Sequence, residues 1–261
     1  MRKEGEVVPD RKRLAADILE RLEYYRELGV KWTARRPAAR AAGRRGDPPR
    51  PSAPGPKPAA RFFPQTESMF DRVAAVSESL EAIRADLGDC QRCKLAHARK
   101  NIVFGSGNPR AGLMFVGEAP GADEDEQGLP FVGRAGQLLT KIIEAIGMRR
   151  EEVYICNILK CRPPENRNPE PDEIASCQPF LLRQIQSVKP KVVCALGTFG
   201  AQTLLLTREP ISKLRGQLID FRGAKLMATF HPAYLLRNPH EKRKVWEDMQ
   251  KIRDYLKAPP A

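Results

Sequence analysis

The stretch from residue 113 to residue 146 places the strongest limits on the fold of this chain. It opens with an apolar run, Leu113 to Val116, continues through a loop rich in glycine and proline, residues 117 to 136, and ends in an apolar pattern with helical spacing. The sequence therefore predicts a strand, a long loop and a helix. Glycines let a backbone approach a ligand closely, and the carboxyl end of a strand is where open α/β sheets bind ligands. The alternative is a solvated acidic loop, but Phe131 and Val132 within it favour a binding loop.

The overall charge indicates what kind of partner the chain binds. Its 261 residues carry a formal net charge of +13, which favours a polyanion, either nucleic acid or an anionic membrane surface. No apolar run is long enough to span a bilayer, and the first residues lack the apolar core of a signal peptide, so we expect a cytoplasmic protein. In that compartment the six cysteines stay reduced, and they are better suited to binding a metal than to forming disulfides.

The first 66 residues divide into two segments of different composition. Residues 1–32 contain an amphipathic helix, predicted over residues 10 to 28 by an apolar stripe at helical spacing. An isolated helix of this length is marginal in water, so we expect its stripe to cover the main domain or a partner protein. Residues 33–66 carry seven arginines against the single acid Asp47 and are predicted to be a disordered basic linker. The linker is either a passive spacer or an arm that adds phosphate contacts.

The remaining residues, 67–261, alternate between strand and helix patterns. Strands are predicted at residues 113–116, 153–159, 191–196 and 225–230, and helices at residues 67–87, 138–146, 172–188, 198–206 and 240–256. This alternation implies an α/β domain with a mainly parallel sheet that is covered on both faces. The carboxyl ends of parallel strands meet at one edge of a sheet. We therefore expect one site there, built from the segments that begin at Gly117, Asn157, Gly197 and His231.

Four of the six cysteines have no place in the predicted strands: Cys90, Cys93, Cys161 and Cys177. The first two form a C-x-x-C pair, and the others fall in a loop and near the start of a helix. Four thiolates suit either a tetrahedral zinc site or an iron–sulfur cluster, and the spacing does not separate the two. Cys156 and Cys194 fall within apolar strands and are predicted to be small core residues.

The segment after the last predicted strand combines a histidine with an apolar tip and a cation. A single histidine at a strand end, such as His231, is usually structural or solvated. Leu235 and Leu236 beside Arg237 suit insertion of a leucine into a base stack with a phosphate contact alongside. The alternative is a turn followed by a helix, with both leucines in the core.

Four motifs occur along the chain. They are Gly117-Glu118-Ala119-Pro120-Gly121 with Glu124-Asp125, then Gly128-x-Pro130-Phe131-Val132-Gly133, then Asn157 through Arg167, and last His231-Pro232-Ala233-Tyr234. Together they resemble the family 4 uracil-DNA glycosylases, the iron–sulfur class, over roughly residues 87 to 256. The resemblance implies a three-layer α/β/α sandwich around a four-stranded parallel sheet. It also implies an enzyme, expected to be a monomer, that hydrolyses the N-glycosidic bond of deoxyuridine in single- or double-stranded DNA, releasing uracil and leaving an abasic site.

The resemblance also implies a role for each site residue. Phe131 resembles the ring that stacks on the extruded uracil, Asn157 the amide that reads its polar edge, and Glu124 the residue near C5. His231 matches the histidine beside uracil O2. The uracil-binding set is completed by Gly117, Glu118 and Ala119, whose backbone lines the sugar side, and the resemblance implies a [4Fe-4S] cluster on Cys90, Cys93, Cys161 and Cys177.

The chemistry of glycosidic cleavage fits these assignments. The departing base gains negative charge, so a donor at O2 stabilises it, and His231 is the candidate for that donor. Other uracil glycosylases place an aspartate where this sequence has Ala119, so Glu118 and Glu124 are the candidates for orienting the attacking water. A water that is merely positioned is the alternative. A non-catalytic nucleic-acid-binding module on the same fold is the competing functional interpretation.

Overall fold

A computed structural model describes residues 78–258 of the chain, and all of them belong to one compact unit. The predicted helix at residues 10 to 28, the predicted linker and the first turns of the helix predicted from residue 67 lie outside the described residues. The α-helices are α3 (Leu80–Leu87), α4 (Ala122–Gln127), α5 (Arg134–Ala145), α6 (Pro171–Val188), α7 (Gly197–Leu205), α8 (Ile211–Leu214), α9 (Pro232–Arg237) and α10 (Lys242–Lys257). Short 3₁₀ turns lie at η1 (Lys94–His97), η2 (Arg150–Glu152), η3 (Pro164–Asn166) and η4 (Pro239–Glu241). No helix within residues 78–258 is long and apolar enough to cross a membrane.

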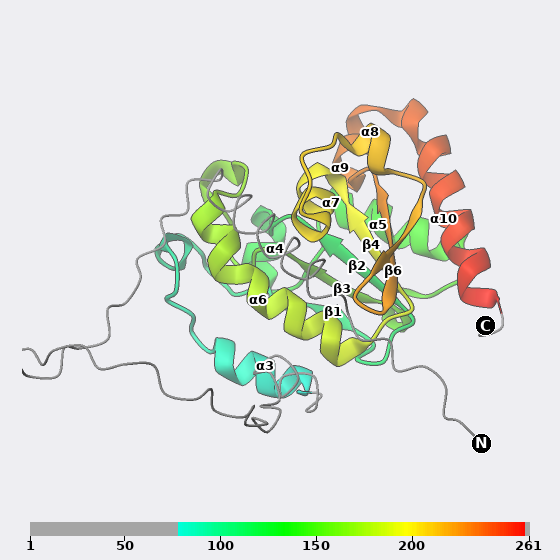
Figure 1. Ribbon diagram of the computed structural model, residues 1–261. Coiled ribbons are helices and arrows are strands. Elements are labelled where there is room, and N and C mark those ends of the chain that lie inside the picture. Colours follow the sequence, from blue (N-terminus) through cyan, green and yellow to red (C-terminus); the bar gives the residue numbers. More distant parts are fainter. Residues whose placement is uncertain (1–77, 259–261) are drawn as a thin grey trace, which may run out of the picture. The chain divides into compact units, whose positions relative to one another are not determined.

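A mixed sheet of six strands lies at the centre of the fold, in the order β1-β3-β2-β4-β6-β5 (Figure 1). Its strands are β1 (Ser106–Gly107), β2 (Leu113–Gly117), β3 (Tyr154–Asn157), β4 (Val192–Leu196), β5 (Leu218–Phe221) and β6 (Ala224–Thr229). The four inner strands are parallel, as predicted, but the two edge strands are antiparallel. The prediction of a four-stranded sheet was therefore wrong in the number of strands. Strand β1 has only two residues, too few to show an alternating apolar pattern in the sequence. Strand β5 contains the exposed Asp220, which interrupts such a pattern.

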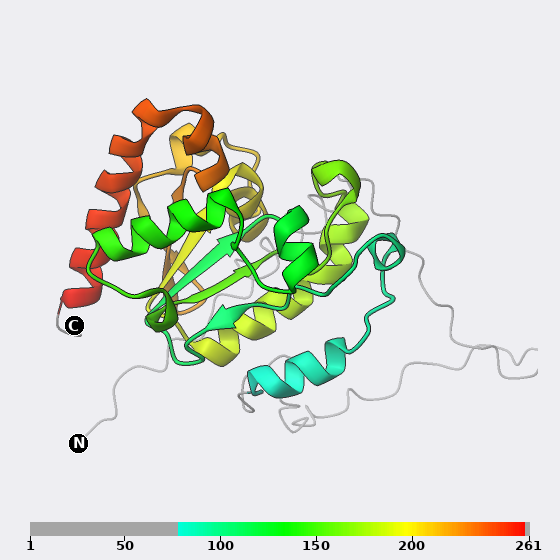
Figure 2. The same cartoon turned by 180° about the vertical axis from the view of Figure 1, so that it is seen from behind.

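Helices cover both faces of the sheet because successive side chains of each inner strand point to opposite sides. In β2, Met114 and Val116 pack into one core with α3, α6 and α7, whereas Leu113 and Phe115 pack into a second core with α5, α9 and α10. Figure 1 shows α3 and α6 in front of the sheet, and Figure 2 brings α5 and α10 forward. All five residues of β2 and all five of β4 are buried, which explains why these strands are continuous apolar runs in the sequence.

The segment between β2 and α5 is not one continuous loop, because α4 interrupts it. Three acidic residues, Asp123 to Asp125, occupy the first turn of α4, where they interact favourably with the helix dipole. Gly128 ends α4 in the left-handed conformation, with φ of 69°.

The strand predicted at residues 153–159 is shorter than expected. The strand ends at Asn157, although the backbone amides of Ile158 and Leu159 still donate to the carbonyls of Gly117 and Glu118 in the neighbouring segment.

Candidate active site

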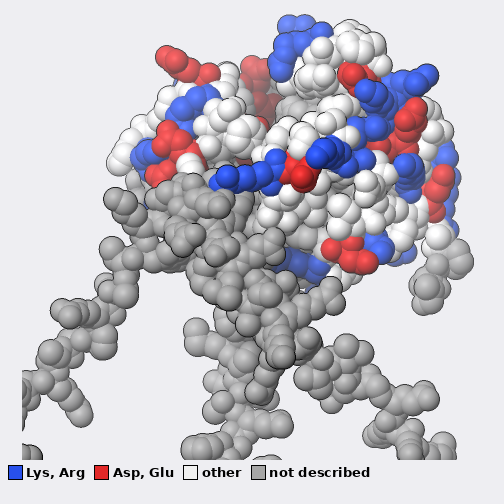
Figure 3. Space-filling model, turned by 45° about the horizontal axis from the view of Figure 1, so that its top comes forward, with Lys and Arg blue, Asp and Glu red and all other residues white. Residues whose placement is uncertain are grey.

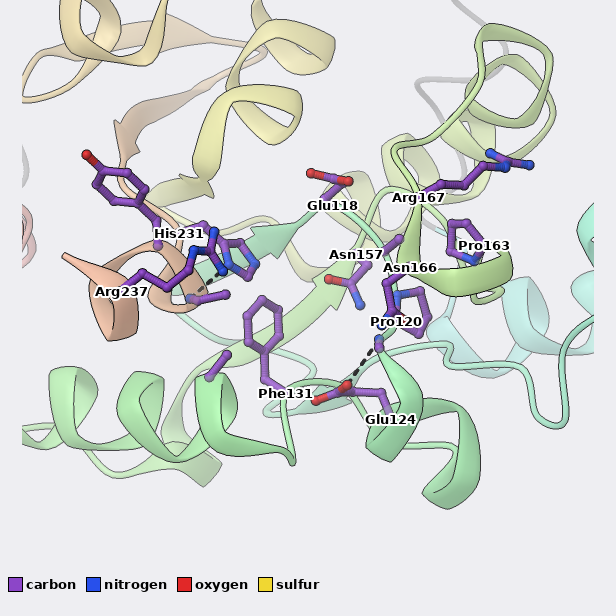
Figure 4. Close-up of a pocket in the computed structure, with 15 residues that line it drawn as sticks. Glu118, Pro120, Glu124, Phe131, Asn157, Pro163, Asn166, Arg167, His231 and Arg237 are labelled. Atoms are coloured by element: carbon purple, nitrogen blue, oxygen red, sulfur yellow. Dashed lines mark hydrogen bonds between the residues drawn. The ribbon is translucent and has the colours of Figure 1, made fainter.

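A cavity of about 460 Å³ opens where the parallel strands end (Figure 4). It contains residues from the segments after β2, β3 and β6, so the structure brings together three of the four segments expected to meet. The lining residues are Glu118, Ala119, Pro120, Gly121, Glu124, Phe131, Ala135, Asn157, Pro163, Asn166, Arg167, His231, Ala233, Tyr234 and Arg237. Gly197, from the fourth segment, lies behind His231: a Cβ atom on it would be 3.0 Å from the Cβ of His231.

Phe131 presents its ring to this cavity from an unusual backbone conformation. Its φ of 54° is in the left-handed region, which a residue with a bulky side chain rarely adopts. Gly136 permits this turn, since a Cβ atom there would lie 1.9 Å from the carbonyl oxygen of Phe131. On the other side, Arg150 in η2 donates to the carbonyl of Pro130 at 2.6 Å. The position of the Phe131 ring is therefore set by the backbone of residues 130 and 131, which Gly136 and Arg150 hold in place.

Glu124 holds the same loop through its carboxylate. Oε1 accepts hydrogen bonds from the backbone amides of Val132 and Gly133, at 2.9 and 3.0 Å, and Oε2 accepts one from Gly121 at 3.0 Å. Figure 4 shows the Gly121 bond and places the carboxylate below the Phe131 ring. Both carboxylate oxygens are thus used to fix the loop that carries Phe131.

Asn157 ends β3, and its side chain points into the cavity (Figure 4). Only 1% of the residue is exposed, and its Oδ1 atom has no hydrogen-bond partner among the described residues. Gly117, at the end of the neighbouring strand, makes room for it. A Cβ atom on Gly117 would lie 2.3 Å from Oδ1 of Asn157 and 2.6 Å from Cζ of Phe131. The missing side chain at Gly117 thus allows the amide and the ring to occupy one site.

His231 caps the N-terminus of α9, and its ring faces Phe131 with 5.5 Å between the ring centroids. Its Nδ1 atom accepts a hydrogen bond from the backbone amide of Ala233 at 3.1 Å. Burial lowers the pKa of His231 from the usual 6.5 to about 4, so the ring is neutral at pH 7. Because Nδ1 is an acceptor, the proton of the neutral ring is on Nε2, which leaves a hydrogen-bond donor for the cavity.

Glu118 and Ala119 form the wall next to the end of β2. Burial raises the pKa of the Glu118 carboxyl from the usual 4.5 to about 7, so it changes charge near neutral pH. Figure 4 shows this carboxyl on the opposite side of Asn157 from Glu124. Ala119 offers only a methyl group and cannot orient a water by itself. Of the two glutamates, Glu118 is the one whose carboxyl is not engaged with the loop backbone.

A second, smaller cavity is lined by Arg92, Lys160 and the four candidate metal ligands, Cys90, Cys93, Cys161 and Cys177. The guanidinium groups of Arg92 and Arg99 donate to Sγ of Cys90 and of Cys161, at 3.5 and 3.4 Å. The backbone amide of Lys160 donates to Sγ of Cys177 at 3.2 Å. The remaining two cysteines, at positions 156 and 194, are fully buried in the strands, as predicted.

Comparisons with known proteins identify the family. Residues 104–250 match the Uracil DNA glycosylase superfamily. The chain is 44% identical over 192 residues to the type-4 uracil-DNA glycosylase of Saccharolobus solfataricus, a match that spans 70% of this chain and 89% of that protein. It is 46% identical over 184 residues to the type-4 enzyme of Thermotoga maritima, which spans 69% of this chain and 96% of that protein. The chain belongs to the type-4 uracil-DNA glycosylases. The resemblance found in the sequence is thereby confirmed.

In this uracil-DNA glycosylase, helix α9 separates the two leucines that the sequence could not distinguish. Leu235 is fully buried in the core shared with α5 and α10, whereas Leu236 is 38% exposed. Arg237, also exposed, lines the mouth of the cavity. Leu236 and Arg237 are therefore available to a bound strand, and Leu235 supports the helix from below.

Several residues of the glycosylase site were not singled out from the sequence. Asn166 and Arg167 line the cavity from η3 and the residue after it. Both fall within the motif from Asn157 to Arg167, but neither was assigned a role from the sequence. Arg167 forms an ion pair with the buried carboxylate of Glu173, and in Figure 4 its guanidinium points away from Asn157. Arg150 had no signal in the sequence, since it precedes β3 and acts on a carbonyl twenty residues earlier.

Proposed function

We propose that this uracil-DNA glycosylase binds an extruded uracil between Phe131, Asn157 and His231 and hydrolyses the bond that joins it to deoxyribose. The products are free uracil and an abasic site. The observation that carries the proposal is the buried amide of Asn157, whose Oδ1 lacks a partner within residues 78–258 and adjoins the cavity. Leaving such a group unpaired costs about 1–3 kcal/mol, a cost that a ligand with a matching donor removes.

Uracil supplies that match. Its N3–H donates and its O4 accepts, and one carboxamide offers both an acceptor and a donor on the same edge. The Phe131 ring provides an apolar plate on which the base stacks. Glu124 fixes the loop that carries the Phe131 ring. It also forms the side of the cavity where the C5 methyl group of a thymine would have to fit.

His231 acts on the departing base. As the glycosidic bond lengthens, negative charge grows on uracil O2, and the Nε2–H of the neutral ring donates to it. A single preorganised donor of this kind is worth roughly 10²–10³ in rate. The low pKa of His231 means that the ring stabilises the anion as a hydrogen-bond donor and not as a cation.

Water attacks the sugar from the wall formed by Glu118. With its pKa near 7, the Glu118 carboxyl is substantially ionised at neutral pH and can orient a water molecule. Glu124 is a poorer candidate for this task because three backbone amides already use its oxygens. Only modest activation is needed, since the sugar already carries positive charge when the water arrives.

Extrusion of the nucleotide requires something to replace it in the stack. Unpairing and unstacking cost a few kcal/mol, and an apolar side chain that enters the gap offsets part of that cost. We assign this role to Leu236, with Arg237 holding the adjacent phosphate. On the face that Figure 3 shows, basic side chains alternate with acidic ones, so local contacts at the cavity mouth matter more than one continuous basic patch.

The four cysteines of the second cavity, Cys90, Cys93, Cys161 and Cys177, would hold a [4Fe-4S] cluster. Nitrogen donors already point at three of the four sulfurs, as thiolates bound to iron require. When bound, the cluster would tie the segment before β2 to the loop after β3 and to α6.

The excision assay tests the base site. Purified protein is incubated with an oligonucleotide that contains uracil opposite guanine, opposite adenine or unpaired, and abasic sites are cleaved with alkali. We expect strand cleavage that falls about 10²–10³-fold in His231→Ala while DNA affinity stays nearly unchanged. An equal loss of affinity would make His231 a DNA-positioning residue instead.

The cluster is tested independently of activity. Protein purified without oxygen should be brown, contain iron and absorb broadly near about 400 nm. Colourless protein loaded with zinc would contradict the proposed cluster and leave the base site unaffected.

A further inference from the structure

Lys160 lies between the cysteine cavity and the uracil pocket and is fully buried. Its Nζ atom donates to the main-chain carbonyl of Asn157 at 2.7 Å and to Oε1 of Gln184 at 2.6 Å. Strand β1 pairs only with Tyr154 and Ile155, so the carbonyl of Asn157 lies beyond that ladder. The lysine thus supplies the donor that a longer edge strand would otherwise provide.

A buried lysine of this kind needs compensating negative charge. Burying an ammonium group costs several kcal/mol even after relaxation, unless an anion lies nearby. Both Nζ partners are neutral, and no carboxylate within residues 78–258 forms an ion pair with Lys160. Lys160 lines the same cavity as Cys161 and Cys177, and its own backbone amide donates to Sγ of Cys177.

A thiolate-ligated cluster would supply the missing anion, because four thiolates carry more negative charge than an iron–sulfide core carries positive charge. We propose that Lys160 is a positioning residue that links this cluster to the base site. Its charge balances the cluster, and its hydrogen bond fixes the peptide that carries the Asn157 amide. The charge-balancing role rests on the cluster proposed above, whereas the hydrogen bond to Asn157 does not.

Gln184 sets the direction of the lysine. Its Oε1 accepts from Lys160, and its Nε2 donates to the carbonyl of Phe104 at 2.9 Å and to the hydroxyl of Tyr154 at 3.3 Å. The glutamine is itself fully buried on α6. The ammonium group is therefore held between a fixed side chain and the end of β3, and it cannot move without disturbing Asn157.

The test uses the full-length protein, purified anaerobically, and begins with the iron content of the wild type. Lys160→Met keeps the length of the side chain but removes its charge and its donors. We expect the cluster of this variant to have a more negative reduction potential, because a nearby positive charge favours the reduced form. We also expect the inhibition constant of free uracil to rise roughly ten- to hundredfold, since small misplacements of a binding group have effects of this size. The matched control is Lys141→Met, at an exposed position of α5, which should change neither quantity.

An unchanged reduction potential and an unchanged uracil inhibition constant in Lys160→Met would overturn the proposal. If this variant does not fold, Gln184→Met decides, because it keeps the lysine and removes the acceptor that directs it. Gln184→Met should keep its iron and bind uracil several-fold more weakly. Unchanged uracil binding would refute the positioning role. Wild-type protein without iron would instead refute the cluster and the charge-balancing role, and weaker uracil binding in Lys160→Met would still support the link to Asn157.

Discussion

The absence of a side chain at Gly117 allows two recognition groups to share one site, and this makes a specific mutation informative. In Gly117→Ala the new methyl group would lie 2.3 Å from Oδ1 of Asn157 and 2.6 Å from the Phe131 ring, so one of them must move. We expect kcat/KM for uracil excision to fall by about 10² or more, with the fold retained. Steady-state kinetics and a thermal melt measure the two effects separately.

Gly112→Ala is the matched control for this mutation. Gly112 directly precedes β2, and its added methyl group would meet only Leu256 Cδ2 at an ordinary 3.8 Å. Excision should remain within a factor of a few of wild type. Equal losses in both variants would mean that the strand, and not the shared site, is sensitive to substitution.

Glu118 gives a pH-dependent prediction whose sign follows from its raised pKa. If the carboxylate orients the water, kcat/KM should rise with pH through about 7, and Glu118→Gln should be slower and lack this step.

The raised pKa of Glu118 also predicts how stability depends on pH. Between pH 4.5 and 7 the folded protein keeps the Glu118 proton that the unfolded chain has released, so the free energy of unfolding decreases as pH rises through this window. Glu118→Gln should therefore melt higher than wild type at pH 8 and nearly equally at pH 5.

A pH–rate profile and melts at the two pH values check this prediction. A profile that keeps its step in Glu118→Gln would assign the ionisation to another group. An unchanged melting temperature at pH 8 would mean that solvent reaches the carboxyl.

The residues that the sequence could identify are those at strand ends or in the segments that follow them. Asn157 ends a buried strand and His231 closely follows one, whereas Phe131 lies in the longer segment between β2 and α5; the topology brings all three segments to one cavity. Arg150 and Lys160 could not be found in this way. Each acts on a backbone carbonyl, that of Pro130 or of Asn157, and only the folded chain shows which carbonyl lacks a donor.

Helix α9 has one face in the core and one toward the cavity mouth, so its two adjacent leucines should behave differently. Leu235→Ala removes a fully buried side chain and should lower the free energy of unfolding by about 2–5 kcal/mol. Leu236→Ala should leave stability within about 0.5 kcal/mol of wild type. It should slow excision from duplex DNA more than from single strands, because only a duplex leaves a gap to fill.

Denaturant melts and excision rates on matched duplex and single-stranded substrates make this comparison. Equal losses on both substrates in Leu236→Ala would remove the proposed role in the stack. A neutral Leu235→Ala would be inconsistent with its position in the core.

The secondary-structure elements show which physical signals the sequence carries. The four parallel strands and the long helices α5, α6 and α10 were predicted because burial on one face or two imposes a clear apolar pattern. Strands β1 and β5 were missed because they pair at the edges, where few residues are needed and one side stays exposed. Helix α4 was missed because it is only six residues long and mostly acidic. It is stabilised by capping and by the buried Asp125, whose side chain accepts hydrogen bonds from the backbone amides of Lys100 and Asn101.

The charge of the whole chain is distributed unevenly, and this predicts how it binds DNA. Residues 33–66 contain seven arginines and one lysine against one aspartate, whereas basic and acidic side chains alternate on the face of the described residues that Figure 3 shows. If the basic segment neutralises phosphates, deletion of residues 1–66 should reduce the slope of log affinity against log salt by about 0.7–0.9 for each phosphate that the segment neutralises in the wild type. Excision at saturating DNA should persist, since the cavity lies within residues 118–237.

Replacing the seven arginines of this segment with glutamine separates charge from length. The substituted chain keeps the same number of residues, so a reach or spacing role is preserved while the positive charge of the arginines is removed. A salt slope as low as that of the deletion would assign the effect to the arginines. A wild-type slope in both variants would show that the segment is a spacer, and the DNA affinity would then come from the cavity mouth, where Arg237 and Leu236 lie.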